Sequence, residues 1–145
     1  MRRILATIGY ERATQAAIVG KLKDAGVEVL IDVRAVAASR RPGFSKTILA
    51  NSLAEHGIDY VHLRALGTPK AGREAARHGR IEEMHIVYEQ QLETPEAQLQ
   101  LAQAAEIASA RKAALLCFEA DHARCHREII AARLAKLRGF KIENL

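Results

Sequence analysis

A strand–loop–helix unit spanning residues 113–139 narrows the choice of fold class for this chain. The unit begins with AALLCF, an apolar run that is short enough for a buried strand. After a polar segment, apolar side chains at positions 129, 130, 134 and 137 recur at helical spacing, and Gly139 follows where a helix would end. In an open α/β sheet, such a unit places its loop at the carboxyl end of a strand, where ligands of this fold class bind.

The same alternation of short apolar runs and helical patterns extends along the rest of the chain. The runs that predict strands lie at residues 4–8, 27–33, 58–63, 113–118 and 141–144. Helices are expected after Thr14 and Ser45, which can cap them, and after Thr94, where Pro95 suits the first helical position. Strands separated by helices pair in parallel, so we expect an open, mostly parallel α/β sheet of about five strands with helices on both faces.

The length of 145 residues is near the usual size of one domain. We expect a single α/β domain over residues 1–145, in which residues 64–110 form a mainly helical insertion between the third and fourth strands. No apolar run approaches the length of a membrane span, and the first residues lack a signal-peptide core. We therefore expect a cytoplasmic protein without a membrane partner. We expect no cofactor, and the sequence does not indicate an oligomeric state.

The net charge of +5 is concentrated in two segments. Residues 34–46 contain four basic residues and no acid, and residues 64–80 contain five basic residues against one acid. Scattered lysines are usually solvated, but the arginines here flank predicted strand ends, and locally clustered basic charge favours anionic partners. We therefore expect an anionic ligand, which would be a nucleotide or a nucleic acid.

Chemically active side chains follow several of the predicted strands. They are Glu11 after the first strand, Asp32 and Arg34 at the end of the second, and Glu119, Cys125, His126 and Arg127 in the last unit. Because the carboxyl ends of parallel strands meet at one edge of a sheet, we expect these side chains to share one cleft. The expected anion-binding residues are Arg34, Arg40, Lys46 and Arg127, with Glu11 beside them. Arginine suits this role because its guanidinium binds phosphate through a bidentate fork.

Cys125 is the candidate nucleophile. It is expected at or just before the start of the last helix, where the backbone N–H groups and the helix dipole favour a thiolate. His126 beside it would act as base or acid, and Asp32 and Glu119 would orient the substrate or exchange protons. The alternative interpretation is a buried structural thiol next to a histidine that caps the helix.

Two other residues also have alternative interpretations. Phe44 lies next to a glycine in a basic loop and would stack on a nucleobase, although a ring folded back onto the core is the preferred interpretation. Glu119 would face the cleft as a catalytic carboxylate, or it would form a salt bridge with Arg34 or Arg127.

The last unit also contains enough donor atoms to bind a metal. The possible ligands are Cys117, Glu119, His122, Cys125 and His126. A cysteine eight residues from another cysteine does not match the usual spacing of zinc sites, and Cys117 is expected to point into the sheet. We therefore expect no metal site.

Several short motifs occur in order along nearly the whole chain. They are Thr7-Ile8-Gly9-Tyr10-Glu11, Asp32-Val33-Arg34, Ser39-Arg40, Gly43-Phe44-Ser45-Lys46, Leu66-Gly67, and Leu116-Cys117-Phe118-Glu119 followed by Cys125-His126-Arg127. This series resembles domain-of-unknown-function family 488. The resemblance implies a small bacterial or archaeal cytosolic domain, and it implies no established reaction.

The residues together favour a small cytosolic enzyme that acts on a phosphate-bearing substrate, a nucleotide or a nucleic acid. Its cleft would lie at the carboxyl edge of the sheet, and its reaction class does not follow from the sequence. Two alternatives stay open. One is a non-catalytic module that binds nucleic acid or nucleotide, and the other is a protein-interaction domain.

Overall fold

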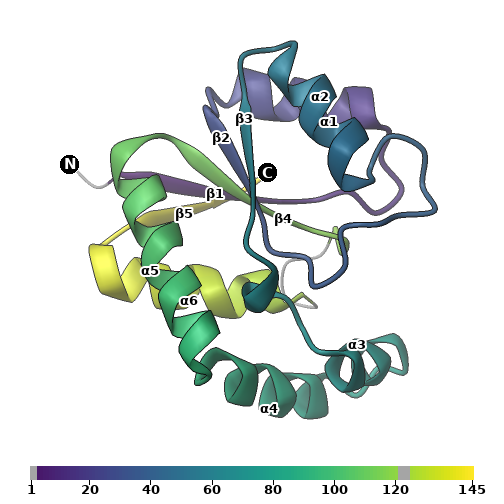
Figure 1. The fold of residues 1–145 in the computed structure, drawn as a ribbon, viewed down its shortest axis with the longest axis vertical. Coiled ribbons are helices and arrows are strands. Elements are labelled where there is room, and N and C mark those ends of the chain that lie inside the picture. Colours follow the sequence, from purple (N-terminus) through teal and green to yellow (C-terminus); the bar gives the residue numbers. More distant parts are fainter. Residues whose placement is uncertain (1–2, 121–124) are drawn as a thin grey trace.

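The computed structural model describes residues 3–120 and 125–145, so His122, a possible metal ligand, lies outside the described residues. The described residues form a five-stranded sheet in the order β3-β2-β4-β1-β5 (Figure 1). Its strands are β1 (Ile4–Gly9), β2 (Val29–Asp32), β3 (Asp59–His62), β4 (Ala113–Cys117) and β5 (Lys141–Asn144), and all pairs are parallel. The predicted open parallel α/β sheet is therefore confirmed.

Helices cover both faces of the sheet (Figure 1). One face carries α1 (Gln15–Asp24) and α2 (Lys46–Ala54). The opposite face carries α5 (Pro95–Ala110) and α6 (His126–Arg138), and α4 (Ile81–Leu92) contributes to the same core cluster from beyond the sheet. Among the described residues, no helix combines the length and the apolar character that crossing a membrane requires.

The two faces follow from the alternation of side chains along each strand. Leu5 and Leu115 pack in the cluster that includes residues of α4, α5 and α6, whereas Ala6 and Leu116 pack with residues of α1 and α2. All four side chains are fully buried. Because both faces are covered, the central strands are apolar at nearly every position, as in other parallel sheets.

Helix boundaries lie where the capping residues predict them. The Thr14 and Thr94 side chains accept hydrogen bonds from the backbone N–H groups of Ala17 and Ala97, at 3.1 and 3.3 Å. Gly139 ends α6 in the left-handed conformation, with φ of 70°. Ser45 occupies the N-cap of α2 but makes no side-chain capping bond, because its hydroxyl bonds the backbone of Ser39 instead.

The segment between β3 and β4 has one part that extends beyond the sheet and one part, α5, that packs on it. It contains a 3-10 turn, η1 (Arg64–Leu66), then α3 (Lys70–Arg77), α4 and α5. α5 packs on the sheet as the crossover helix into β4, so the part that extends beyond the sheet is α3 with α4 (Figure 1). The Tyr88 hydroxyl donates to the Leu66 carbonyl at 2.7 Å, which ties α4 to the turn after β3.

The strand order creates a topological switch point between β1 and β4. These strands are neighbours, but the chain leaves β1 through α1 towards β2 and leaves β4 through α6 towards β5, on the other side. The two connections therefore leave the carboxyl ends of β1 and β4 on opposite faces of the sheet. In open α/β sheets, ligands bind in the crevice outside such a point.

Candidate functional site

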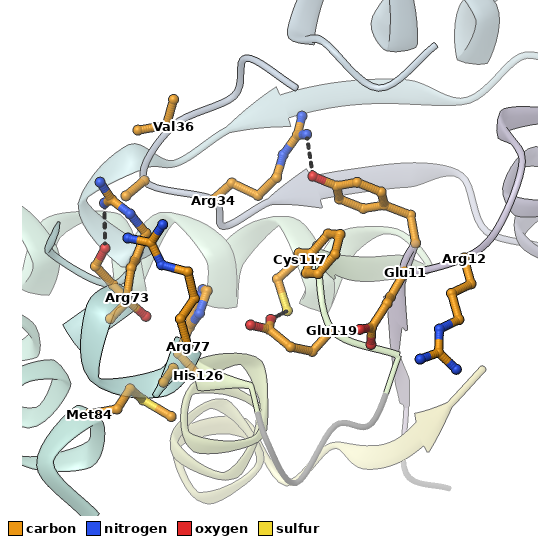
Figure 2. Close-up of a pocket in the computed structure, with 15 residues that line it drawn as sticks. Glu11, Arg12, Arg34, Val36, Arg73, Arg77, Met84, Cys117, Glu119 and His126 are labelled. Atoms are coloured by element: carbon orange, nitrogen blue, oxygen red, sulfur yellow. Dashed lines mark hydrogen bonds between the residues drawn. The ribbon is translucent and has the colours of Figure 1, made fainter. Parts of the chain in front are cut away.

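A cavity of about 810 Å³ lies at this carboxyl edge (Figure 2). Its walls come from the loops after β1, β2 and β4, from α3, and from the first residue of α6. Segments far apart in the sequence therefore meet at the switch point. The predicted position of the site, at the carboxyl edge, coincides with this cavity.

Four arginines among the described residues line the cavity, and one of them, Arg34, is paired with Asp32. Arg73 and Arg77 lie one helical turn apart on α3, and Arg12 lies across the cavity in the loop after β1 (Figure 2). The Arg73 guanidinium donates to the Thr68 carbonyl at 2.9 Å, whereas Arg77 and Arg12 are exposed. Arg12 has a φ of 61°, a conformation that non-glycine residues rarely adopt and that concentrates at functional sites.

A cluster of two sulfurs and one imidazole lies where β4 ends and α6 begins. Cys117 is the last residue of β4, Cys125 is the N-cap of α6 and His126 is the first residue of that helix. The two Sγ atoms are joined in a disulfide, and the Cys125 Sγ lies 3.8 Å from the His126 Nδ1. Both cysteines are buried, and Cys117 borders the cavity together with His126. Cys117 packs in the buried core cluster, as expected of a residue that points into the sheet, and it also borders the cavity.

The hydrogen bonding of His126 identifies its protonated nitrogen. Nε2 lies 2.8 Å from the Val33 carbonyl oxygen, which can only accept, so Nε2 carries the proton and Nδ1 presents a lone pair towards Cys125. Burial lowers the pKa of His126 to about 4, with a smaller contribution from the Arg127 charge, against the opposing effect of the Val33 hydrogen bond. The imidazole is therefore neutral at pH 7.

Arg127 holds the loop after β4 from inside the protein. Its side chain is 1% exposed and donates to the carbonyl oxygens of Glu119 and Ala120, the latter at 3.0 Å. A third contact runs from Nη1 to the Cys117 Sγ at 3.4 Å. Arg127 is not among the described residues that line the cavity, and its predicted role as an anion ligand stays a prediction.

Asp32 and Arg34 form a buried ion pair at the wall of the cavity. The Asp32 carboxylate is fully buried, and it accepts from the Arg34 guanidinium at 2.7 to 3.0 Å and from the Tyr60 hydroxyl. Arg34 also donates to the Tyr10 hydroxyl and to the Phe44 carbonyl, at 3.2 and 2.8 Å. Burial alone would lower the pKa of Arg34, but the hydrogen bonds and charge of Asp32 outweigh it and raise the pKa. Arg34 is among the residues that line the cavity, and the predicted roles of the pair in proton exchange and anion binding stay predictions.

The remaining predicted site residues are dispersed. Phe44 is 1% exposed and stacks on Tyr10, with ring centroids 4.4 Å apart, so the preferred core interpretation is confirmed. Arg40 and Lys46 are exposed, and neither is among the described residues that line the cavity. Glu11 does line it, and its carboxylate accepts from the Ala120 N–H at 3.2 Å. Sequence reasoning did not identify Arg12, and a non-glycine turn residue directly after a strand was its only signal.

The glycine of the first motif is required by close backbone packing at this edge. A Cβ atom on Gly9 would lie 1.8 Å from the Glu119 carbonyl oxygen and 2.5 Å from the Arg127 guanidinium. Gly9→Ala should therefore lower the free energy of unfolding by about 1–3 kcal/mol, measured by urea denaturation. Gly20→Ala is the matched control, because a Cβ in this α1 position meets nothing within 4 Å. That control should be neutral or stabilising by up to about 1 kcal/mol. Equal stability of the two variants would contradict the packing at Gly9.

A family model matches most of the chain. The model, described as Domain of unknown function DUF488, matches residues 14–134, which include the loops after β2 and β4, the α3 arginines and the sulfur–imidazole cluster. A search of curated proteins and a search of solved structures found no significant match. The resemblance seen in the motifs is thus confirmed at the level of the family.

Proposed function

We propose that this chain, which belongs to the DUF488 family, is a small cytosolic enzyme acting on a phosphate-bearing substrate, a nucleotide or a nucleic acid, in the cavity at the carboxyl edge of the sheet. One observation carries the proposal. Arg12, Arg73 and Arg77 line the same cavity as the thiol–imidazole cluster, so an anion held by the arginines faces reactive groups.

The size and lining of the cavity suit a nucleotide. A volume of about 810 Å³ lies within the range of small-molecule sites. The Phe118 ring is 41% exposed and packs edge-on against Tyr10, with ring centroids 5.4 Å apart. It therefore offers an aromatic surface on which a base can stack, in place of the buried Phe44. The arginines would then bind the phosphates through bidentate hydrogen bonds.

The catalytic part of the proposal rests on Cys117, Glu119 and His126. All three line the cavity, and the neutral imidazole presents Nδ1 towards the Cys125 sulfur, which becomes a thiol when the disulfide is reduced. Such pairing is how a thiol is activated by an adjacent base. The burial of both thiols, which are 1% and 2% exposed, favours the second candidate, a non-catalytic module that binds the same anions. Turnover of a bound nucleotide separates the two.

The α3 arginines should determine the salt dependence of binding. We expect a labelled mononucleotide and a short labelled single-stranded oligonucleotide to bind more weakly as salt rises, as followed by fluorescence anisotropy. Each phosphate contact with a single strand contributes a slope of about −0.7 in the logarithm of affinity against the logarithm of salt concentration. The double variant Arg73→Ala/Arg77→Ala should therefore lose about 1.4 of the oligonucleotide slope.

Arg138→Ala is the matched control for this experiment. Arg138 ends α6, pairs with Glu106 at 2.8 Å and lies outside the cavity lining among the described residues. Its loss should leave the slope unchanged. Absence of binding at low salt, or equal effects of the double variant and the control, would contradict the proposal.

A further inference from the structure

The sulfur–imidazole cluster has the composition of a metal site. Sγ of Cys117, Sγ of Cys125 and a ring nitrogen of His126 all lie within 4.8 Å of one another. When the disulfide is reduced, these residues offer two thiolates and a neutral imidazole. Zinc sites use this ligand set, whose soft donors favour Zn²⁺ over Mg²⁺ or Ca²⁺. We propose that these three residues bind a thiophilic divalent cation, of which Zn²⁺ is the expected one.

The orientation of His126 supports this assignment. Histidines that bind metals almost always donate their other ring N–H to a carboxylate, a backbone carbonyl or water, which fixes the tautomer. The hydrogen bond from Nε2 to the Val33 carbonyl, at 2.8 Å, makes that arrangement here. It leaves the Nδ1 lone pair directed at the cluster, 3.8 Å from the Cys125 sulfur.

The backbone separation of the two cysteines suits a shared cation better than a disulfide. Their Cα atoms are 7.3 Å apart, whereas disulfides usually span about 4.4–6.8 Å. Two thiolates on one tetrahedral zinc, each about 2.3 Å from the metal, keep their sulfurs about 3.8 Å apart and accept a wider backbone span. A cation between the sulfurs therefore fits the positions of β4 and α6 without bringing their backbones together.

The surrounding charges also fit a cation. The Arg127 Nη1 lies 3.4 Å from the Cys117 sulfur, which stabilises that thiolate. The Glu119 carboxylate lies 3.8 Å from the same sulfur, on the cavity side. Two thiolates and this carboxylate together balance a divalent cation and the buried guanidinium.

A metal with these ligands would keep one position towards the cavity. Cys117, Glu119 and His126 all line it, and a site with three protein ligands leaves a fourth position for water or substrate. The usual spacing rule for zinc does not apply because the ligands come from a strand end and a helix start, which the fold brings together from eight residues apart.

The test is a titration of the full chain, reduced and freed of metal by a chelator, with Co²⁺ as a spectroscopic probe and then with Zn²⁺. We expect one cation per chain, a thiolate-to-cobalt charge-transfer band, and displacement of Co²⁺ by Zn²⁺. His126→Gln should weaken Co²⁺ binding by more than the 10–100-fold that loss of a supporting residue typically causes. His56→Gln, at an exposed position after α2, is the matched control and should bind as the parent does.

Cys125→Ser should abolish the charge-transfer band or weaken it strongly, with circular dichroism of each variant confirming that it is folded. If the reduced chain binds neither Co²⁺ nor Zn²⁺ while both thiols react with Ellman's reagent, the proposal is overturned. Unchanged affinity in folded His126→Gln would overturn it equally. Because the titration uses the metal alone, its failure would leave the anion-binding proposal standing.

Discussion

Asp32→Ala should lower the free energy of unfolding by about 3–5 kcal/mol, because it leaves the Arg34 guanidinium buried without a counter-charge. Arg34 is 6% exposed, and three of its hydrogen bonds end on Asp32 side-chain oxygens. The Tyr60 hydroxyl would lose its acceptor as well. Chemical denaturation monitored by circular dichroism measures the loss.

The exposed pair Arg80–Glu83 provides the control. Both side chains are 54% exposed and lie 2.6 Å apart at helical i,i+3 spacing, so Glu83→Ala should cost no more than about 0.5 kcal/mol. The double variant Asp32→Leu/Arg34→Met should recover much of the stability that Asp32→Ala loses, since an apolar pair leaves no charge buried. If Asp32→Ala lowers the free energy of unfolding by less than about 1 kcal/mol and abolishes nucleotide binding, the predicted functional role of Asp32 is supported instead.

The fold was predictable because its signals are local. The strands are short apolar runs, and capping residues such as Thr14 and Gly139 mark helix ends whatever the tertiary context. The role of α5 was not predictable in the same way. Its alanine-rich buried stripe, Ala104, Ala105 and Ala108, allows close packing on the sheet, but the pattern does not say which surface it meets.

The position of the candidate site could be predicted from the sequence, but only some of the residues that line the cavity could. Parallel strands bring their carboxyl ends to one edge, which located the cavity. Whether a polar side chain there faces solvent depends on tertiary partners, so the sequence could not show that Arg34 donates to Asp32, Tyr10 and the Phe44 carbonyl at the cavity wall. The position of the α3 arginines depends on close packing of that helix on α4, where a Cβ on Gly72 would lie 3.2 Å from the Val87 side chain.

Arg127→Ala should lower the free energy of unfolding by about 3 kcal/mol or more, because hydrogen bonds to a charged group contribute about 1.5–3 kcal/mol each. Its guanidinium donates to the Glu119 and Ala120 carbonyls and to the Cys117 sulfur, all at the wall of the cavity. Arg127→Lys should recover little of this, since an ammonium lacks the planar fork that reaches two carbonyls at once.

Arg133→Ala on the same helix is the matched control for Arg127. Arg133 is 29% exposed and pairs with Glu89 and Glu93 at the surface, so its loss should cost no more than about 1 kcal/mol. Thermal and urea denaturation of both variants compare the two. If Arg127→Ala unfolds like the control but loses nucleotide affinity, Arg127 is a ligand-binding residue as the sequence predicted. If Arg127→Ala loses stability as expected, Arg127 instead holds the loop that places Glu119 at the cavity. Any loss of nucleotide affinity in the folded fraction of that variant should then come from displacement of this loop.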